Sequence, residues 1–176
     1  MIKEILNEYQ KNLTMLAIYV NVEEGENFAV GYIVDVIDEQ ILFLNIGLHG
    51  EFDGYTAAYI DDIYRVETDS RYIKKMQQLC SFDLNNILKI EKEQSAIMFL
   101  IDTAFKEKRV IKLSVAEKDN VITGFIIKKN SDFIEVLQLD EYGDEDGRTI
   151  IKYDDIVQVC CDDLDCYDMQ ILHDKL

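Results

Sequence analysis

The chain has 176 residues and carries 35 acidic against 18 basic side chains, which gives a formal net charge of -17. Because 48% of its residues are hydrophobic, it can bury a core, and a disordered acidic tail is excluded. Its longest apolar run, residues 96–101, has six residues, whereas a membrane-spanning helix needs roughly 20.

The first predicted element is a helix. Apolar residues recur there at helical spacing, at Ile2, Ile5, Leu6, Tyr9 and Leu13. Alternation of apolar and polar residues then predicts five strands, over residues 18–22, 28–37, 40–48, 55–60 and 63–67. Gly31 lies inside the second strand, where a glycine indicates a bulge or a sharp bend. Five short strands with one bend predict a small closed barrel.

Two helical segments are predicted after these strands. Ile73, Met76 and Leu79 form a short apolar stripe, and Ser70 precedes it as an N-cap. Residues 83–90 then predict a helix that links this part to the rest of the chain. The chain contains no proline, which fits a plan in which no helix is interrupted.

The second half of the chain repeats the first. Adding 93 to each number aligns residues 16–79 with 109–172 without a gap, and 20 of the 64 pairs, about 31%, are identical. The matching helix, over residues 97–105, follows an offset of 95, which predicts a helix-to-strand connector two residues shorter. We therefore expect a mainly β chain with flanking helices, built by duplication from two units, residues 1–82 and 83–176.

Each predicted unit resembles the Sm-like barrel and the wider group of SH3-like barrels. The resemblance is carried by residues 30–33 and 60–63 and by their counterparts 123–126 and 153–156. Residues 53–56 and 69–72 further resemble a group of uncharacterised bacterial proteins. The resemblance implies two tandem five-stranded barrels, and Sm-like proteins typically form rings and bind RNA. A shared fold alone does not transfer that function.

The charge of the chain argues against a nucleic-acid partner. Where Sm-like proteins contact RNA, this chain has Asp61-Asp62 and Asp154-Asp155, which would repel phosphates. Residues 1–93 hold 8 basic against 17 acidic side chains, and residues 94–176 hold 10 against 18. Neither half is therefore basic, and RNA binding is kept only as an alternative function.

No metal or cofactor site is predicted. Cys160 and Cys161 would point to opposite faces of a strand, and Cys166 stands where the first copy has the core residue Ile73, so these are interpreted as core thiols rather than zinc ligands. The acidic turn at residues 140–147 lacks the calcium-loop residues at its first and last ligand positions and is interpreted as a solvated hairpin tip.

No catalytic site is predicted either. His49 and His173 have no counterpart in the other copy, and neither has a placed serine or cysteine partner. The recurring Asp61-Asp62 pair could supply an acid and a base, but aspartates that accept backbone N–H bonds in a turn are the better interpretation. We expect a protein that is not an enzyme.

The function predicted from these observations is binding to a protein partner or to another copy of the chain. Tyrosine is favoured at interfaces, and the first unit holds the candidate binding residues Tyr32, Tyr55, Tyr59 and Tyr64. A second alternative is an acidic antagonist of a basic partner such as a toxin. The polar N-terminus and the spacing of the four cysteines predict a cytoplasmic location, with no membrane contact.

Overall fold

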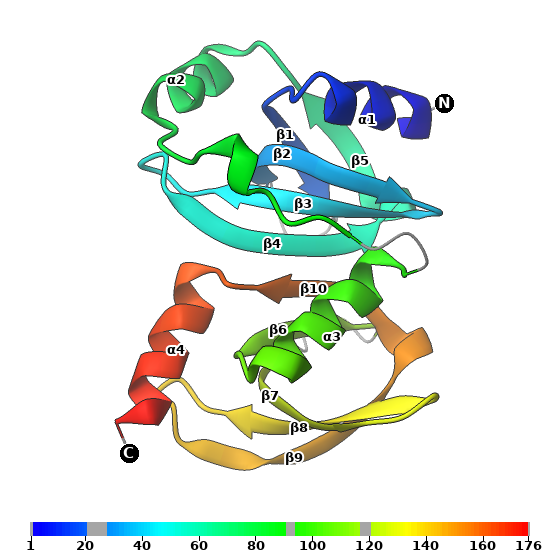
Figure 1. The fold of residues 1–176 in the computed structure, drawn as a ribbon, viewed down its shortest axis with the longest axis vertical. Helices are drawn as coiled ribbons and strands as arrows, with labels where there is room; N and C mark the ends of the chain where they lie inside the picture. Colours follow the sequence, from blue (N-terminus) through cyan, green and yellow to red (C-terminus); the bar gives the residue numbers. More distant parts are fainter. Residues whose placement is uncertain (1, 21–27, 91–93, 117–120, 176) are drawn as a thin grey trace. The chain divides into compact units, whose positions relative to one another are not determined.

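A computed structural model describes residues 2–20, 28–90, 94–116 and 121–175 of the chain. Two compact units are distinguished, Met1–Ala96 and Ile97–Leu176. Each contains a helix, five strands, a short 3-10 turn before the fifth strand, and a further helix after it (Figure 1). The chain is mainly β, as predicted. The division falls after Ala96, whereas the sequence predicts it after residue 82.

The elements of each unit follow the same order. The first unit contains α1 (Ile2–Lys11), β1 (Leu16–Val20), β2 (Phe28–Ile37), β3 (Gln40–Ile46), β4 (Phe52–Tyr59), η2 (Ile60–Asp62), β5 (Ile63–Glu67), α2 (Arg71–Leu79) and η3 (Leu84–Asn86). The second contains α3 (Ala96–Glu107), β6 (Ile111–Val115), β7 (Val121–Lys129), β8 (Phe133–Leu139), β9 (Glu145–Lys152), η4 (Tyr153–Asp155), β10 (Ile156–Cys161) and α4 (Leu164–Asp174).

The prediction of two closed five-stranded barrels is wrong, because the strands form open antiparallel sheet. Hydrogen-bonded neighbours follow the order β5-β1-β2-β3-β4 in the first unit and β10-β6-β7-β8-β9 in the second. Closure of a barrel requires a ladder between the two strands at the ends of such an order, and among the described residues no ladder joins β4 to β5 or β9 to β10. Alternation in the sequence predicts strands, and Gly31 predicts a bend, but neither tells which strands pair.

The strand register corrects the alignment of the first strands. Leu16 pairs with Gly31 in the first unit, and Ile111 pairs with Gly124 in the second. Leu16 is therefore the counterpart of Ile111, an offset of 95, whereas the two glycines keep the offset of 93. The two-residue difference lies between β6 and β7, so the prediction of a shorter connector between helix and strand is wrong. The pairing of Ile18 with Ile111 in the gapless alignment is wrong for the same reason.

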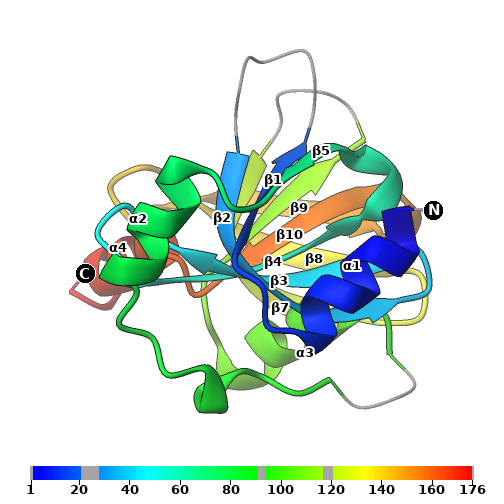
Figure 2. The ribbon, with the colours of Figure 1, turned by 90° about the horizontal axis from the view of Figure 1, so that it is seen from above.

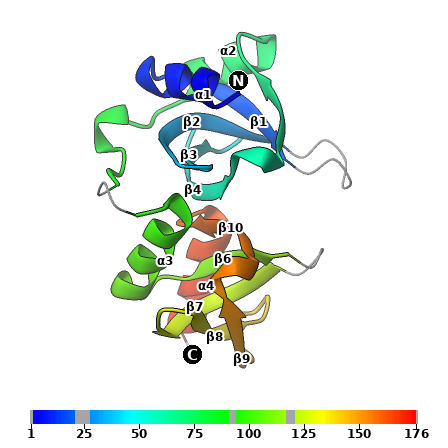
Figure 3. The same cartoon turned by 90° about the vertical axis from the view of Figure 1, so that its right-hand side faces the viewer.

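Irregularities in the ladders recur at equivalent positions of the two units. The β2–β3 ladder shifts register between Ile33 and Asp35, and the β7–β8 ladder shifts between Ile126 and Lys128. The shifts between β3 and β4 and between β1 and β5 also recur in the second unit. Such bulges increase the local bend of a strand, and β2 curls around the core of the first unit (Figure 3).

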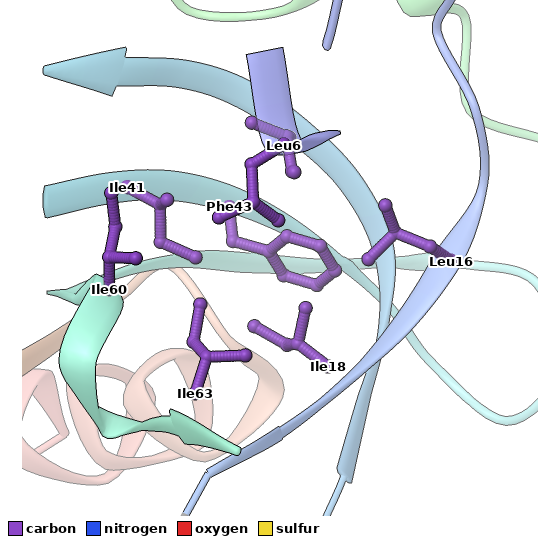
Figure 4. Close-up of a cluster of buried hydrophobic side chains, with 8 residues drawn as sticks. Leu6, Leu16, Ile18, Ile41, Phe43, Ile60 and Ile63 are labelled. Atoms are coloured by element: carbon purple, nitrogen blue, oxygen red, sulfur yellow. The ribbon is translucent and has the colours of Figure 1, made fainter. Parts of the chain in front are cut away.

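The core of the first unit lies between α1 and the curled sheet. Phe43 is fully buried there, and Leu6 of α1 and Ile18 of β1 lie beside its ring (Figure 4). Of the apolar stripe predicted for this helix, Leu6 is buried, while Ile2 and Ile5 are exposed. Contacts with β2 hold the helix on the sheet (Figure 2). Leu6 is thus the residue of α1 that is fully buried in this core, and Tyr9 packs against the same core.

The helix after each fifth strand begins at a side-chain cap. The Ser70 hydroxyl accepts a hydrogen bond from the backbone N–H of Ile73, as predicted, and the Asp163 carboxylate accepts one from Cys166 at the equivalent position. Residues 83–90, by contrast, do not form the predicted helix. Asp83 caps only the short turn η3, and the chain beyond it is not helical.

Candidate functional site

Four aromatic side chains form a cluster on the first unit: Tyr19 of β1, Phe28 of β2, Tyr64 of β5 and Tyr72 of α2, hereafter the aromatic cluster. The ring of Tyr19 stacks on Phe28 with 5.1 Å between centroids, and its edge meets Tyr64 at 6.2 Å. Phe28 in turn makes a T-shaped contact with Tyr72 at 5.7 Å. Phe28 is 42% exposed and Tyr64 44% exposed, so part of this aromatic surface faces solvent.

A cation is already held against one ring of the cluster. The Arg65 guanidinium lies over Tyr19, 4.4 Å from the ring centroid, and donates to the Glu67 carboxylate at 2.7 Å. The Tyr19 hydroxyl donates to the same carboxylate at 3.3 Å. Hydrogen bonds from Ser70 and then from Tyr19, together with the charge of Arg65, lower the pKa of Glu67. The face of Tyr19 is thus suited to a cation whose charge a carboxylate balances.

A groove of about 390 Å³ opens beside two of these rings. Its walls come from the start of β2, the end of β3 and the turn after it, the start of β4, and α2. They include Phe28, Tyr72, Leu48, Asn45 and Asp53. The volume is within the range of small-ligand sites in proteins. The walls combine aromatic faces with a carboxylate and an amide, so the groove can contact both the apolar and the polar part of a ligand.

The second unit has no aromatic residue at any of the four equivalent positions. Tyr19 pairs with Phe28 in the β1–β2 ladder, and the corresponding pair in β6–β7 is Ser114 with Val121. Tyr64 and Tyr72 are replaced by Val157 and Asp165. Because the second unit has the same strand order and the same bulges without these rings, the backbone does not require them. An exposed aromatic group that folding does not require indicates a binding surface.

The four tyrosines predicted to bind a partner lie in different surroundings. Tyr64 belongs to the aromatic cluster, and Tyr59 is half-buried next to η2. Tyr32 and Tyr55 are both buried; burial and the neighbouring Cys80 raise the pKa of Tyr32 to about 12. The Tyr55 hydroxyl accepts a hydrogen bond from the backbone N–H of Leu88 at 3.3 Å, which fixes the segment after η3. Of the four, Tyr64 alone lies on the cluster.

Phe28 was not among the residues predicted from the sequence to bind a partner. A signal for it was present, because the counterparts of Phe28 and of the three tyrosines of the cluster in the second copy are not aromatic. That comparison requires the correct offset for the first strand, and the gapless alignment set Tyr19 against Lys112 instead of Ser114.

The cysteine- and aspartate-rich end of β10 is organised by ion pairs. The Lys112 ammonium contacts the Asp163 carboxylate at 2.5 Å and Asp165 at 3.1 Å, and Arg109 pairs with Asp162 at 2.5 Å. Burial raises the pKa of the Cys161 and Cys166 thiols. The basic side chains here neutralise the acidic ones, and within the described ranges no group of three or more potential ligands could hold a metal ion.

We expect Lys112→Met to destabilise the second unit by about 1–3 kcal/mol, because it leaves the largely buried Asp163 carboxylate without its cation. The control is Lys3→Met, which removes an exposed pair with Glu39 and should cost less than about 0.5 kcal/mol. Urea unfolding followed by far-UV circular dichroism measures both. Equal effects of the two variants would contradict the structural role of Lys112.

The other acidic and histidine candidates have local partners or exposed positions. Asp61 and Asp62 lie exposed in η2, where no side chain caps the turn, and partial burial followed by the charge of Asp61 raises the pKa of Asp62. The Asp140 carboxylate accepts N–H bonds from Tyr142 and Asp144 and so closes the hairpin tip. His173 packs on a phenylalanine ring and contacts a carbonyl of the same tip. None of these contacts assembles a catalytic group with a nucleophile.

Comparison of the chain with protein-family models, with curated proteins and with solved structures finds no match. Within the part of the chain that the structure describes, no helix is both long and apolar enough to cross a membrane. The site is therefore interpreted from its own chemistry.

Proposed function

We propose that this chain is a non-enzymatic protein-interaction module and that its partner contacts the aromatic cluster of the first unit. The observation that carries the proposal is the exposure of Phe28 and Tyr64 in one unit, when the other unit keeps the same strand order without them. Aromatic side chains dominate the energetics of protein interfaces because they bury a large area with little conformational freedom to lose.

The shared order of elements and the recurring bulges support the proposal that one unit arose by duplication of the other. After a duplication, one unit can acquire a binding surface while the other keeps only the common fold. A cytoplasmic location remains part of the proposal and is supported by the cysteines, which form no disulfide among the described residues. Membership of an uncharacterised bacterial family stays a prediction.

A pull-down from native lysate with quantitative mass spectrometry tests the proposed function. We expect the wild-type chain to enrich at least one protein that the double variant Phe28→Ser with Tyr64→Ser captures at least tenfold less, because each ring contributes on the order of 1–2 kcal/mol to an interface. The matched control is Val121→Ser, which changes an exposed residue at the position equivalent to Phe28.

Light scattering identifies the case in which the partner is a second copy of the chain. Circular dichroism of each variant verifies that the fold is retained. A strictly monomeric wild-type chain that enriches nothing, or enrichment that the double variant keeps in full, would show that the aromatic cluster is not a binding surface.

A further inference from the structure

The groove beside Phe28 and Tyr72 combines three features that select a cation. Two aromatic side chains, Phe28 and Tyr72, line it, and aromatic rings attract cations electrostatically. The Asp53 carboxylate is part of the same wall. The surrounding unit is acidic, since residues 1–96 contain 17 acidic and 8 basic side chains. Each feature alone is common, but together they favour a ligand that is flat or slender, partly apolar and positively charged.

The aromatic cluster already contains one example of such recognition. Arg65 stacks on Tyr19 while its guanidinium donates to Glu67 at 2.7 Å, so one ring and one carboxylate hold one arginine. On the other side of the cluster, the contact between Phe28 and Tyr72 borders the groove, and Asp53 lies in the same wall. The groove thus has two rings and a carboxylate among its lining residues, the same kinds of group that contact Arg65.

The charge of the chain decides between the classes of occupant. A second copy would bring another net charge of -17, and a nucleic acid would bring phosphates, so both would be repelled on approach. A basic segment would be attracted over a distance of about a Debye length, roughly 8 Å at physiological salt. Arginine suits the groove better than lysine, because its planar guanidinium stacks on rings and is weakly hydrated.

We propose that this groove binds an arginine side chain in a basic, extended segment of a partner protein. This inference rests on the proposed function and deepens it by naming the chemistry of the partner. The guanidinium lies against the rings of Phe28 and Tyr72 with Asp53 as its counter-charge, and the neighbouring basic residues of the segment face the acidic surface. The binding is non-covalent and weakens as salt is added.

Fluorescence polarisation with labelled nine-residue peptides tests the inference. The peptides share a Gly-Ser background and carry three arginines, three lysines, three norleucines or three glutamates. We expect the arginine peptide to bind at least tenfold more tightly than the norleucine and glutamate peptides and more tightly than the lysine peptide. Phe28→Ser should weaken its binding about tenfold, while Val121→Ser should not change it.

Two aspartate variants separate a site from general electrostatic attraction. Asp53→Asn and Asp146→Asn remove the same charge from equivalent positions near the starts of β4 and β9. We expect Asp53→Asn to weaken the arginine peptide about tenfold and Asp146→Asn to change it less than twofold. Equal effects of the two variants would overturn the inference, because they would show diffuse attraction to an acidic chain.

Other outcomes overturn the inference without touching the proposed function. If the norleucine peptide binds as tightly as the arginine peptide, or if a short mixed-sequence RNA binds more tightly, the groove does not select arginine. If no peptide binds while the double variant still loses a partner from the lysate, the aromatic cluster is a binding surface for a segment of different chemistry.

Discussion

Gly31→Ala is expected to destabilise the first unit by about 3 kcal/mol or more. A Cβ atom at this position would lie 1.8 Å from the carbonyl oxygen of Leu44 and 3.2 Å from the ring of Phe43. The oxygen belongs to the backbone of the paired strand, so relief requires that β2 and β3 separate where their ladder is formed. Urea unfolding measures the loss, and hydrogen exchange of peptides from β3 assigns it to the first unit.

The chain provides two matched controls for this substitution. Gly124→Ala places a Cβ 1.9 Å from the Leu137 carbonyl oxygen and should destabilise the second unit to a similar extent. Gly147→Ala has no atom within 4 Å, but its backbone has a φ of +84°, so it should cost only about 1–2 kcal/mol of backbone strain. If Gly31→Ala were no worse than Gly147→Ala, the close approach of the two strands would not be what requires a glycine.

Local features of the fold were predictable because they depend on residues close together in the sequence. The fifth strand has its predicted bounds, the Ser70 cap is present, and Gly31 lies two residues before a bulge. Whether the strands close into a barrel was not predictable, because the pairing of the first and last strands of each order depends on residues far apart in the sequence. The predicted helix at residues 83–90 failed for a related reason, since Asp83 satisfies only one turn and Tyr55 binds the backbone of Leu88 from a distant strand.

The candidate site was predictable only in part. Tyrosine content directed attention to the first unit, where the aromatic cluster lies, but it did not separate buried from exposed rings. In β3 and β4 most consecutive residues are buried on both faces, so the alternation that marks an exposed face is lost there, and Tyr55 lies in such a strand. Tyr64 lies at the register shift between β5 and β1, where its neighbours Ile63 and Arg65 pair with Val20 and Tyr19. A bulge of this kind follows from pairing and is not visible in the local sequence.

Phe43→Ala should cost the first unit about 3–5 kcal/mol, a large part of the stability of a domain of this size. The ring is the largest of the fully buried side chains and contacts residues from α1, β1 and the turn before β5. Its removal leaves a cavity among Leu6, Ile18 and Ile60. The surrounding strands and helix can relax into such a cavity only in part. The loss is measured by urea unfolding, with hydrogen exchange of α1 as a local readout.

Two substitutions distinguish the cavity from a general loss of apolar area. Phe43→Leu keeps most of the volume and should cost less than about 1.5 kcal/mol. Val136→Ala, at the equivalent buried position of β8, removes fewer atoms and should cost about 2 kcal/mol without changing exchange in α1. Since Leu6 of α1 and Phe43 belong to the same buried cluster, exchange in α1 should rise more in Phe43→Ala than exchange in α2. Equal increases in the two helices would contradict the assignment of α1 to this core.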